Sequence, residues 1–161
     1  MFDVKKIDAT DKREFYQELA MQAKGLLHDE SNRIANAANL AALIYHSLAD
    51  VNWAGFYFMD AGELVVGPFQ GKPACVRIPI GKGVCGTAVA ERRTQRVEDV
   101  DAFEGHIPCD GDSRSEIVVP LELNGEIFGV LDIDAPIKAR FDADDQEGIE
   151  ALAAIFVKSL S

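Results

Sequence analysis

With 161 residues, 48% of them hydrophobic and 27% charged, the chain has the composition of one globular domain, not of a disordered or membrane protein. Its 27 acidic and 16 basic residues give a formal net charge of −11, which disfavours nucleic acid and anionic membrane surfaces as partners. No apolar run approaches the ~20 residues that span a bilayer, and the N-terminal residues lack the apolar stretch of a signal peptide, so we expect a cytoplasmic protein.

Two amphipathic helices are expected within residues 1–50. Asp11 followed by Glu14 is typical of a helix N-cap, and the apolar positions after it predict a helix that ends near residues 25–27. Ser31 is expected to cap the second helix, whose predicted apolar face extends from Ile34 to Leu48.

Short aromatic and β-branched runs follow from residue 52. Residues 52–59, 63–70 and 74–80 are typical of strands in an antiparallel meander, and residues 84–93 favour a short helix with Cys85 in its first turn. The polar, acidic segment 98–115 has no periodic apolar pattern and contains Cys109. A loop of this length is often functional.

The last part of the chain predicts a hairpin and a helix. Residues 116–123 and 126–134 flank Asn124-Gly125, a strong signal for a two-residue turn, and we expect this hairpin at the centre of the sheet. Residues 142–160 are expected to form the C-terminal helix. The order indicates one α+β domain over 1–161: N-terminal helices in 1–50, sheet and active-site loops in 51–135, and the helix at 142–160. The terminal helices should pack on one face of about six strands, and a loop should cover a pocket on the other.

The chain has three cysteines, an odd number, and these do not make the disulfide framework of a secreted protein. Cys109 has His106 before it, which would lower the thiol pKa if protonated, and Asp110 after it, which would raise it. Cys85 at a helix N-terminus would be favoured as a thiolate, and Cys75 begins a predicted strand. Because no C-x₂-C pair occurs, zinc is disfavoured, and we expect neither a metal nor a cofactor.

A second group of candidates is acidic. Asp132 and Asp134 project from the same face of their strand, where they could bind an ammonium group, donate a proton, or simply be solvated. A strict hairpin register pairs Ile117 with Asp132 and places Glu116 on the opposite face. If Glu116 joins the aspartates, a bulge near Pro120 is required.

Trp53 and Tyr57 lie four residues apart and therefore share a face of the first strand. They either pack in the core or form an aromatic wall for a small apolar group of a ligand.

Four segments together resemble a known family: NWAGFYF, VGPFQGKPACVRIPIGKGVCGTA, FEGHIPCDGDSRSEIVVPL and GVLDIDAP. They resemble the free methionine-(R)-sulfoxide reductases, enzymes built on a single GAF domain, and the resemblance covers the chain from about Trp53 to Phe141. Cysteines in GKPAC, GVCG and GHIPCD together distinguish this family from other GAF domains. Glu104 and Pro108 stand where the family more usually has a proline and a small residue, which alters the loop but not the expected roles.

The resemblance implies a role for each candidate residue. Cys109 would be the nucleophile, Cys75 the main resolving thiol, and Cys85 a relay or substitute. The substrate, free methionine (R)-sulfoxide, would contact Glu116, Asp132 and Asp134, and its methyl group would lie against Trp53 and Tyr57.

Attack of a thiolate on the sulfoxide sulfur requires protonation of the departing oxygen, so one acid should be a proton donor. The resulting sulfenic acid on Cys109 would condense with Cys75 to a disulfide, which a thioredoxin-like dithiol reduces. The resemblance also suggests a homodimer. Two other functions stay open: a GAF module that binds a small ligand and signals, and a thiol redox sensor without turnover.

Overall fold

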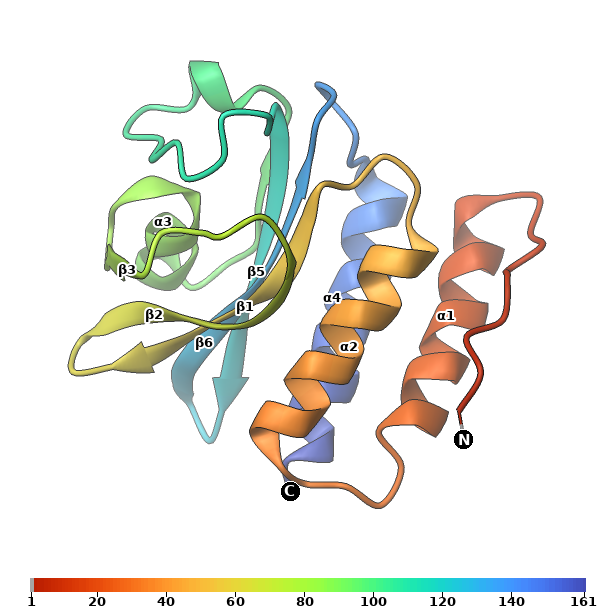
Figure 1. Ribbon diagram of the computed structural model, residues 1–161. Coiled ribbons are helices and arrows are strands. Elements are labelled where there is room, and N and C mark those ends of the chain that lie inside the picture. The colour runs from red at the N-terminus through yellow and green to blue at the C-terminus, as the bar shows by residue number, and fades with distance from the viewer. Residues whose placement is uncertain (1) are drawn as a thin grey trace.

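The computed structural model describes residues 2–161. Its helices are α1 (Lys12–Leu26), α2 (Arg33–Ser47), α3 (Gly83–Glu91), α4 (Ala143–Ser159) and the short 3₁₀ helix η1 (Val100–Ala102). Its strands are β1 (Trp53–Asp60), β2 (Glu63–Gly71), β3 (Arg77–Pro79), β4 (Gln95–Val97), β5 (Ser115–Leu123) and β6 (Glu126–Ala135). The six strands form one antiparallel sheet in the order β3-β2-β1-β6-β5-β4 (Figure 1), which confirms the predicted α+β class.

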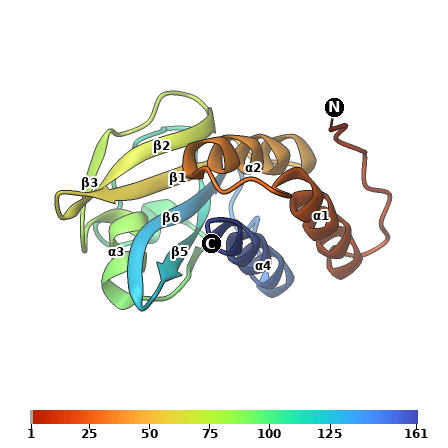
Figure 2. The ribbon, with the colours of Figure 1, turned by 90° about the horizontal axis from the view of Figure 1, so that it is seen from below.

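Helices cover both faces of this sheet. On one face α2 packs against β1 and β2, and α4 packs against β5. The N-terminal helices and α4 lie on this one face, as expected, and within this layer α1 packs against α4 and α2 at the outer edge (Figure 2). The opposite face carries α3, which packs against β5 and β6. Two apolar clusters fill the layers, one under α2 and α4 and one under α3.

Local side-chain signals fix most helix starts. Asp11 caps α1 by accepting a hydrogen bond from the Glu14 N–H at 2.8 Å. Asp142 and Asp145 form a reciprocal capping box at the start of α4, with N···O distances of 3.0 and 2.9 Å. Both predicted N-termini are therefore confirmed.

The prediction for α2 is wrong in two details. Its cap is Asn32, which accepts from the Ala35 N–H at 2.9 Å, instead of Ser31. Ile34 is 57% exposed, because the buried face is rotated from the predicted one. That face consists of Asn36, Ala37, Leu40, Ala41, Leu43 and Ile44. Alanines occur all round this helix, so its sequence defines the buried stripe only weakly.

The β5–β6 hairpin contains the expected bulge. Because of this bulge, Glu116 pairs with Asp134, and the strict register that pairs Ile117 with Asp132 is wrong. Leu123 pairs with Glu126 next to the turn, but the register shifts between Leu121 and Glu122, where Phe128 is the extra residue of β6. Pro120 stays paired with Val130, so the bulge lies beside the proline and on the opposite strand. Strand β6 lies at the sheet centre next to β1, and β5 is one strand further out.

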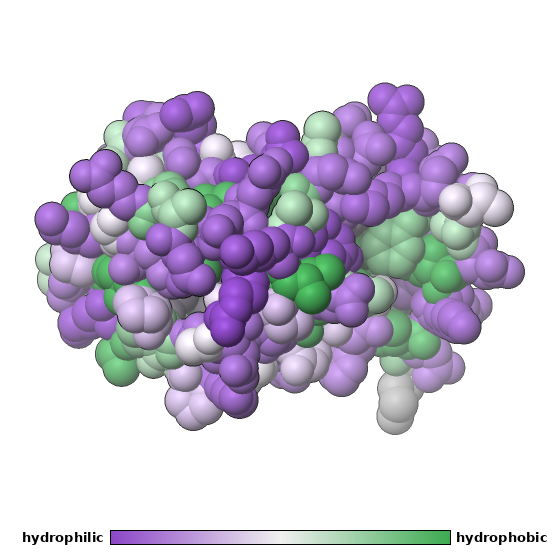
Figure 3. All heavy atoms as spheres, turned by 90° about the horizontal axis from the view of Figure 1, so that it is seen from above, coloured by the Kyte–Doolittle hydropathy of each residue, from purple (hydrophilic) through white to green (hydrophobic). Residues whose placement is uncertain are grey.

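The exterior is largely polar. The face shown in Figure 3 presents mainly hydrophilic side chains, with apolar ones in small scattered groups. Within residues 2–161, none of the helices combines the length and apolar character that a membrane crossing requires.

Candidate active site

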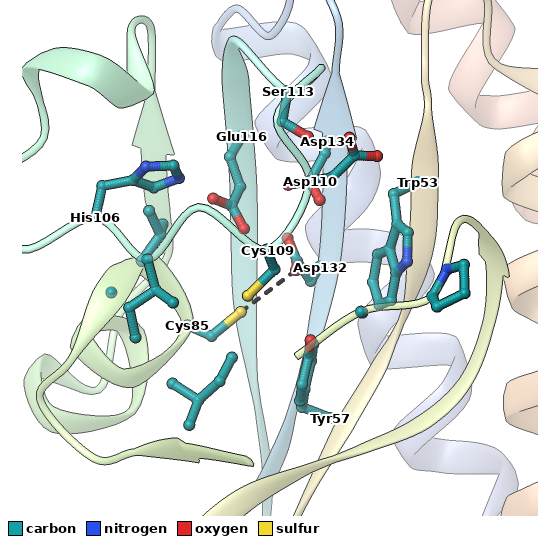
Figure 4. Close-up of a pocket in the computed structure, with 16 residues that line it drawn as sticks. Trp53, Tyr57, Cys85, His106, Cys109, Asp110, Ser113, Glu116, Asp132 and Asp134 are labelled. Carbon is teal, nitrogen blue, oxygen red and sulfur yellow. Dashed lines mark hydrogen bonds between the residues drawn. The ribbon is translucent and has the colours of Figure 1, made fainter. Parts of the chain in front are cut away.

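The sheet register gathers the predicted acids and aromatics on the face under α3. The Phe128 bulge places Glu116 opposite Asp134, and Trp53 of β1 lies opposite Asp134 from the other side. Because side chains alternate along a strand, Tyr57 and Asp132 point to this same face. Figure 4 shows these side chains directed into one pocket, with Cys109 on the loop above it.

A cavity of about 40 Å³ lies between this sheet face, α3 and the loop of residues 98–114, which we call the Cys109 loop. Sites for small organic ligands typically measure about 300 Å³ or more, whereas one liquid water occupies about 30 Å³. In the disulfide form the cavity therefore has room for water molecules and is small for an amino acid.

Three carboxyl groups, Glu116, Asp132 and Asp134, form what we call the acid cluster. Glu116 and Asp132 are 8% and 5% exposed, and the Oδ1 atoms of Asp132 and Asp134 are buried with no hydrogen-bond partner among residues 2–161. Burial raises the pKa of each carboxyl well above its usual range, and the charge of a neighbouring member raises it further. Each carboxyl of the cluster therefore keeps its proton to a higher pH than an isolated carboxyl group does.

Cys85 lies in the first turn of α3 and is buried. Its Sγ donates a hydrogen bond to Asp132 Oδ2 at 3.4 Å. Burial raises the pKa of this thiol well above its usual value, and the charge of Asp132 raises it further. The expectation that the helix N-terminus favours a Cys85 thiolate is thus wrong, because burial among acids outweighs the helix dipole.

The other two cysteines are joined. Cys75, in the segment of residues 72–76 before β3, forms a disulfide with Cys109, and their Cα atoms are 5.3 Å apart. We call residues 72–76 the Cys75 segment. The disulfide closes the Cys109 loop over the cavity and brings together two thiols that lie 34 residues apart in the sequence.

His106 lines the same cavity. Partial burial lowers the pKa of its imidazole below the usual value, although the charge of Asp101 opposes this shift. The imidazole is therefore neutral at pH 7. It supplies a hydrogen-bonding group to the cavity, not the positive charge that would lower the pKa of the Cys109 thiol.

The two aromatic residues pack in the core and also line the cavity. Trp53 stacks on Phe69 and Tyr57, with ring centroids 5.0 and 5.9 Å apart, and is part of the apolar cluster under α3. Both rings also line the cavity. Their polar atoms hold the Cys75 segment, because Trp53 Nε1 donates to the Lys72 carbonyl at 3.1 Å and Tyr57 Oη donates to the Cys75 carbonyl at 3.0 Å.

Sequence reasoning missed the residues that hold the Cys109 loop. The Asn52 side-chain amide donates to Asp110 Oδ2 and to Ser113 Oγ, both at 3.2 Å. Lys72 and Asp112 form an exposed ion pair between the two cysteine-bearing segments at 2.7 Å. These contacts join residues far apart in the sequence, so no local pattern indicates them.

One group of side chains has the composition of a metal site. Ligand atoms of Cys85, Glu116 and Asp132 lie within 4.8 Å of one another. The sequence contains no close spacing that would indicate these three residues as ligands, since only the fold brings them together. Because the pKa values of these three groups are raised, a metal ion would compete with protons for their ligand atoms.

Comparison with known proteins agrees with this geometry. Residues 32–160 match the GAF domain family. The free methionine-R-sulfoxide reductase of Escherichia coli (strain K12) is 51% identical over 151 residues, covering 94% of this chain and 92% of that protein. The solved structure of fRMsr of Staphylococcus aureus in its reduced form is 56% identical with a TM-score of 0.89, covering 91% of this chain and 95% of that chain. The free methionine-R-sulfoxide reductase from Neisseria meningitidis, solved in complex with its substrate, is 44% identical with a TM-score of 0.95, covering 99% and 96%.

Proposed function

Since the chain belongs to the GAF domain family and, within it, to the free methionine-R-sulfoxide reductases, we propose that it reduces free methionine (R)-sulfoxide to methionine with Cys109 as the nucleophile. The observation that carries this proposal is the Cys75–Cys109 disulfide across the mouth of a cavity lined by buried carboxyl groups. It supplies a redox-active thiol pair and a proton source at one place.

The reaction proceeds in three balanced steps. The Cys109 thiolate attacks the sulfoxide sulfur, the oxygen takes up a proton, and methionine leaves behind a sulfenic acid on Cys109. The Cys75 thiol then condenses with this sulfenic acid, which releases water and forms the disulfide. A dithiol reductant exchanges with the disulfide, so both cysteines return to thiols and the reductant is oxidised.

The acid cluster has two tasks in this scheme. A carboxyl group whose raised pKa lets it keep its proton to higher pH can donate that proton to the departing oxygen, and an ionised neighbour can hold the ammonium group of the amino acid. Glu116, Asp132 and Asp134 share these tasks. Trp53 and Tyr57 form the wall for the methyl group, and Cys85, protonated beside Asp132, serves as a relay thiol.

The cavity size adds a conformational requirement. Because the cavity of the disulfide form measures only about 40 Å³, entry of the substrate requires the Cys109 loop to move, and reduction of the disulfide frees the loop to do so.

The same proposal includes the reductant, the cellular compartment and the oligomeric state of the enzyme. A thioredoxin-like dithiol in the cytoplasm is the expected reductant, because a reducing compartment keeps the resting thiols available. We also propose that residues 1–161 form one domain, of which Met1 lies outside the described residues, and that the chain is a homodimer. Sedimentation of the purified protein measures its oligomeric state.

The experiment that tests the proposal compares two cysteine variants. With a several-fold excess of methionine (R)-sulfoxide over protein and no reductant, Cys109→Ser should form no methionine. Cys75→Ser should still form about one equivalent and then stop, since its sulfenic acid has no resolving thiol. Equal loss in both variants contradicts the assignment of the nucleophile.

A further inference from the structure

Asn52 connects the start of β1 to the Cys109 loop. Its backbone N–H donates to the Asp134 carbonyl at 3.0 Å, which fixes it to the neighbouring strand β6. Its side-chain amide donates to Asp110 Oδ2 and Ser113 Oγ, both at 3.2 Å. Ser113 is 7% exposed, and the Ser113 N–H donates to the Asp110 carbonyl at 3.2 Å, so these contacts hold a closed turn directly after Cys109.

The adjoining residues of the same strand hold the other half of the disulfide. Trp53 Nε1 donates to the Lys72 carbonyl and Tyr57 Oη to the Cys75 carbonyl. The first half of β1, together with Asn52 directly before it, therefore anchors both cysteine-bearing segments to the sheet. The distance between the two sulfur atoms depends on these anchors, because neither segment is a regular helix or strand at its cysteine.

We propose that Asn52 is a positioning residue that sets how favourably Cys109 pairs with Cys75, and thereby the reduction potential of the disulfide. When the disulfide is closed, the loop cannot move away from Asn52. When it is reduced, the loop is free to relax. Contacts of Asn52 therefore stabilise the disulfide form relative to the dithiol form.

The polarity of the Asn52–Asp110 contact makes this proposal specific. The Asn52 amide is the donor and the Asp110 carboxylate the acceptor, while the other Asp110 oxygen accepts from the Asp112 N–H at 2.9 Å. Asn52 Oδ1 is buried and has no hydrogen-bond partner within residues 2–161. A carboxylate at position 52 would bury a charged oxygen there and face Asp110 with like charge.

The test is a redox titration of the full-length protein in glutathione buffers, in which two glutathione thiols reduce the disulfide to two protein thiols and form one glutathione disulfide. Differential alkylation and peptide mass analysis measure the Cys75–Cys109 disulfide. Asn52→Asp should shift the equilibrium at least about tenfold towards the dithiol, which corresponds to about 30 mV for this two-electron couple. Asn52→Ala should shift it in the same direction by less.

Two further variants separate positioning from a general loss of structure. The double variant Asn52→Asp with Asp110→Asn reverses donor and acceptor in the same contact and removes the like-charge repulsion, so it should move the equilibrium back towards that of the parent protein by at least about threefold relative to Asn52→Asp. Asn39→Asp, an exposed substitution on α2 with the same change of charge, should leave the potential unchanged. Unchanged potentials in Asn52→Asp and Asn52→Ala, or no rescue by the reversed pair, overturn the proposal.

The assignment of Cys109 as nucleophile rests on the proposed function, but the titration uses no methionine sulfoxide. A protein that lacks sulfoxide reductase activity would still show the shift and its rescue. If the protein reduces methionine sulfoxide but its reduction potential does not change in the Asn52 variants, the proposed function stands and this inference is wrong.

Discussion

Replacing Asp132 by Asn should lower activity and raise stability at the same time. Asp132 lies at the centre of the acid cluster, where Oδ2 accepts from Cys85 and the buried Oδ1 has no partner among the described residues. An amide keeps the shape and can donate to a neighbouring carboxyl oxygen. It cannot, however, donate an acidic proton or carry the charge that binds an ammonium group.

The magnitudes follow from these two changes. Loss of a general acid typically costs about 10²–10⁴-fold in rate. A buried polar atom without a partner costs on the order of 1–3 kcal/mol, so the free energy of unfolding should rise by a similar amount. For a chain of this length each kcal/mol raises Tm by about 2–4 °C.

The gain in stability should depend on pH with a defined sign. The pKa of Asp132 is raised in the folded state, so the folded protein binds more protons than the unfolded chain once the pH exceeds the unfolded value of about 3.9. The parent protein therefore loses stability as pH rises from there through the folded pKa. The difference between variant and parent should be smallest in acid and increase towards neutral pH.

Quench-flow measurement of methionine formed in a single turnover gives the rate, and thermal melts from acid to neutral pH give the stability. Asp8→Asn, an exposed substitution with the same change of charge, is the matched control and should alter neither quantity. A single-turnover rate within about threefold of the parent, or a lower Tm at neutral pH, would refute the reasoning.

Three further changes test other parts of the site. Cys85→Ala removes a hydrogen bond that lowers the pKa of Asp132, so the alkaline limb of the single-turnover pH profile should move to higher pH, and a downward move would count against the proton-donor role. Tyr57→Phe removes the bond to the Cys75 carbonyl and should slow disulfide formation more than methionine release in rapid-quench experiments; equal slowing would contradict the anchoring role. Gly55→Ala would drive a methyl group into the Phe69 backbone and should cost about 1–3 kcal/mol in denaturant unfolding, whereas an unchanged midpoint would show that β1 and β2 can separate freely.

Much of the fold follows from signals within a few residues of one another. Asp11 and Asp142 cap their helices through contacts three residues along the chain. Asn124 and Gly125 adopt the positive φ angles, 53° and 82°, that a two-residue hairpin requires. Such devices operate locally, so the sequence alone was enough to predict them.

The arrangement of the site depends on longer-range effects. Phe128 is the extra residue that turns Glu116 towards the aspartates, yet nothing in its own neighbourhood marks it as a bulge. The position of Cys85 at the start of α3 predicted a lowered thiol pKa, but burial and the neighbouring Asp132 raise that pKa instead. Asn52 acts through residues about 60 positions away, at Asp110 and Ser113. Family resemblance, rather than local pattern, indicated which cysteines pair.

The central claim, that this fold turns over free methionine sulfoxide, is tested most directly with separated sulfoxide epimers. The protein is incubated with a dithiol reductant and either the (R) or the (S) epimer, and released methionine is measured by amino-acid analysis. Methionine should accumulate over many turnovers from the (R) epimer alone. Absence of epimer-selective release, while oxidants still form the Cys75–Cys109 disulfide, would contradict the claim and indicate a redox sensor.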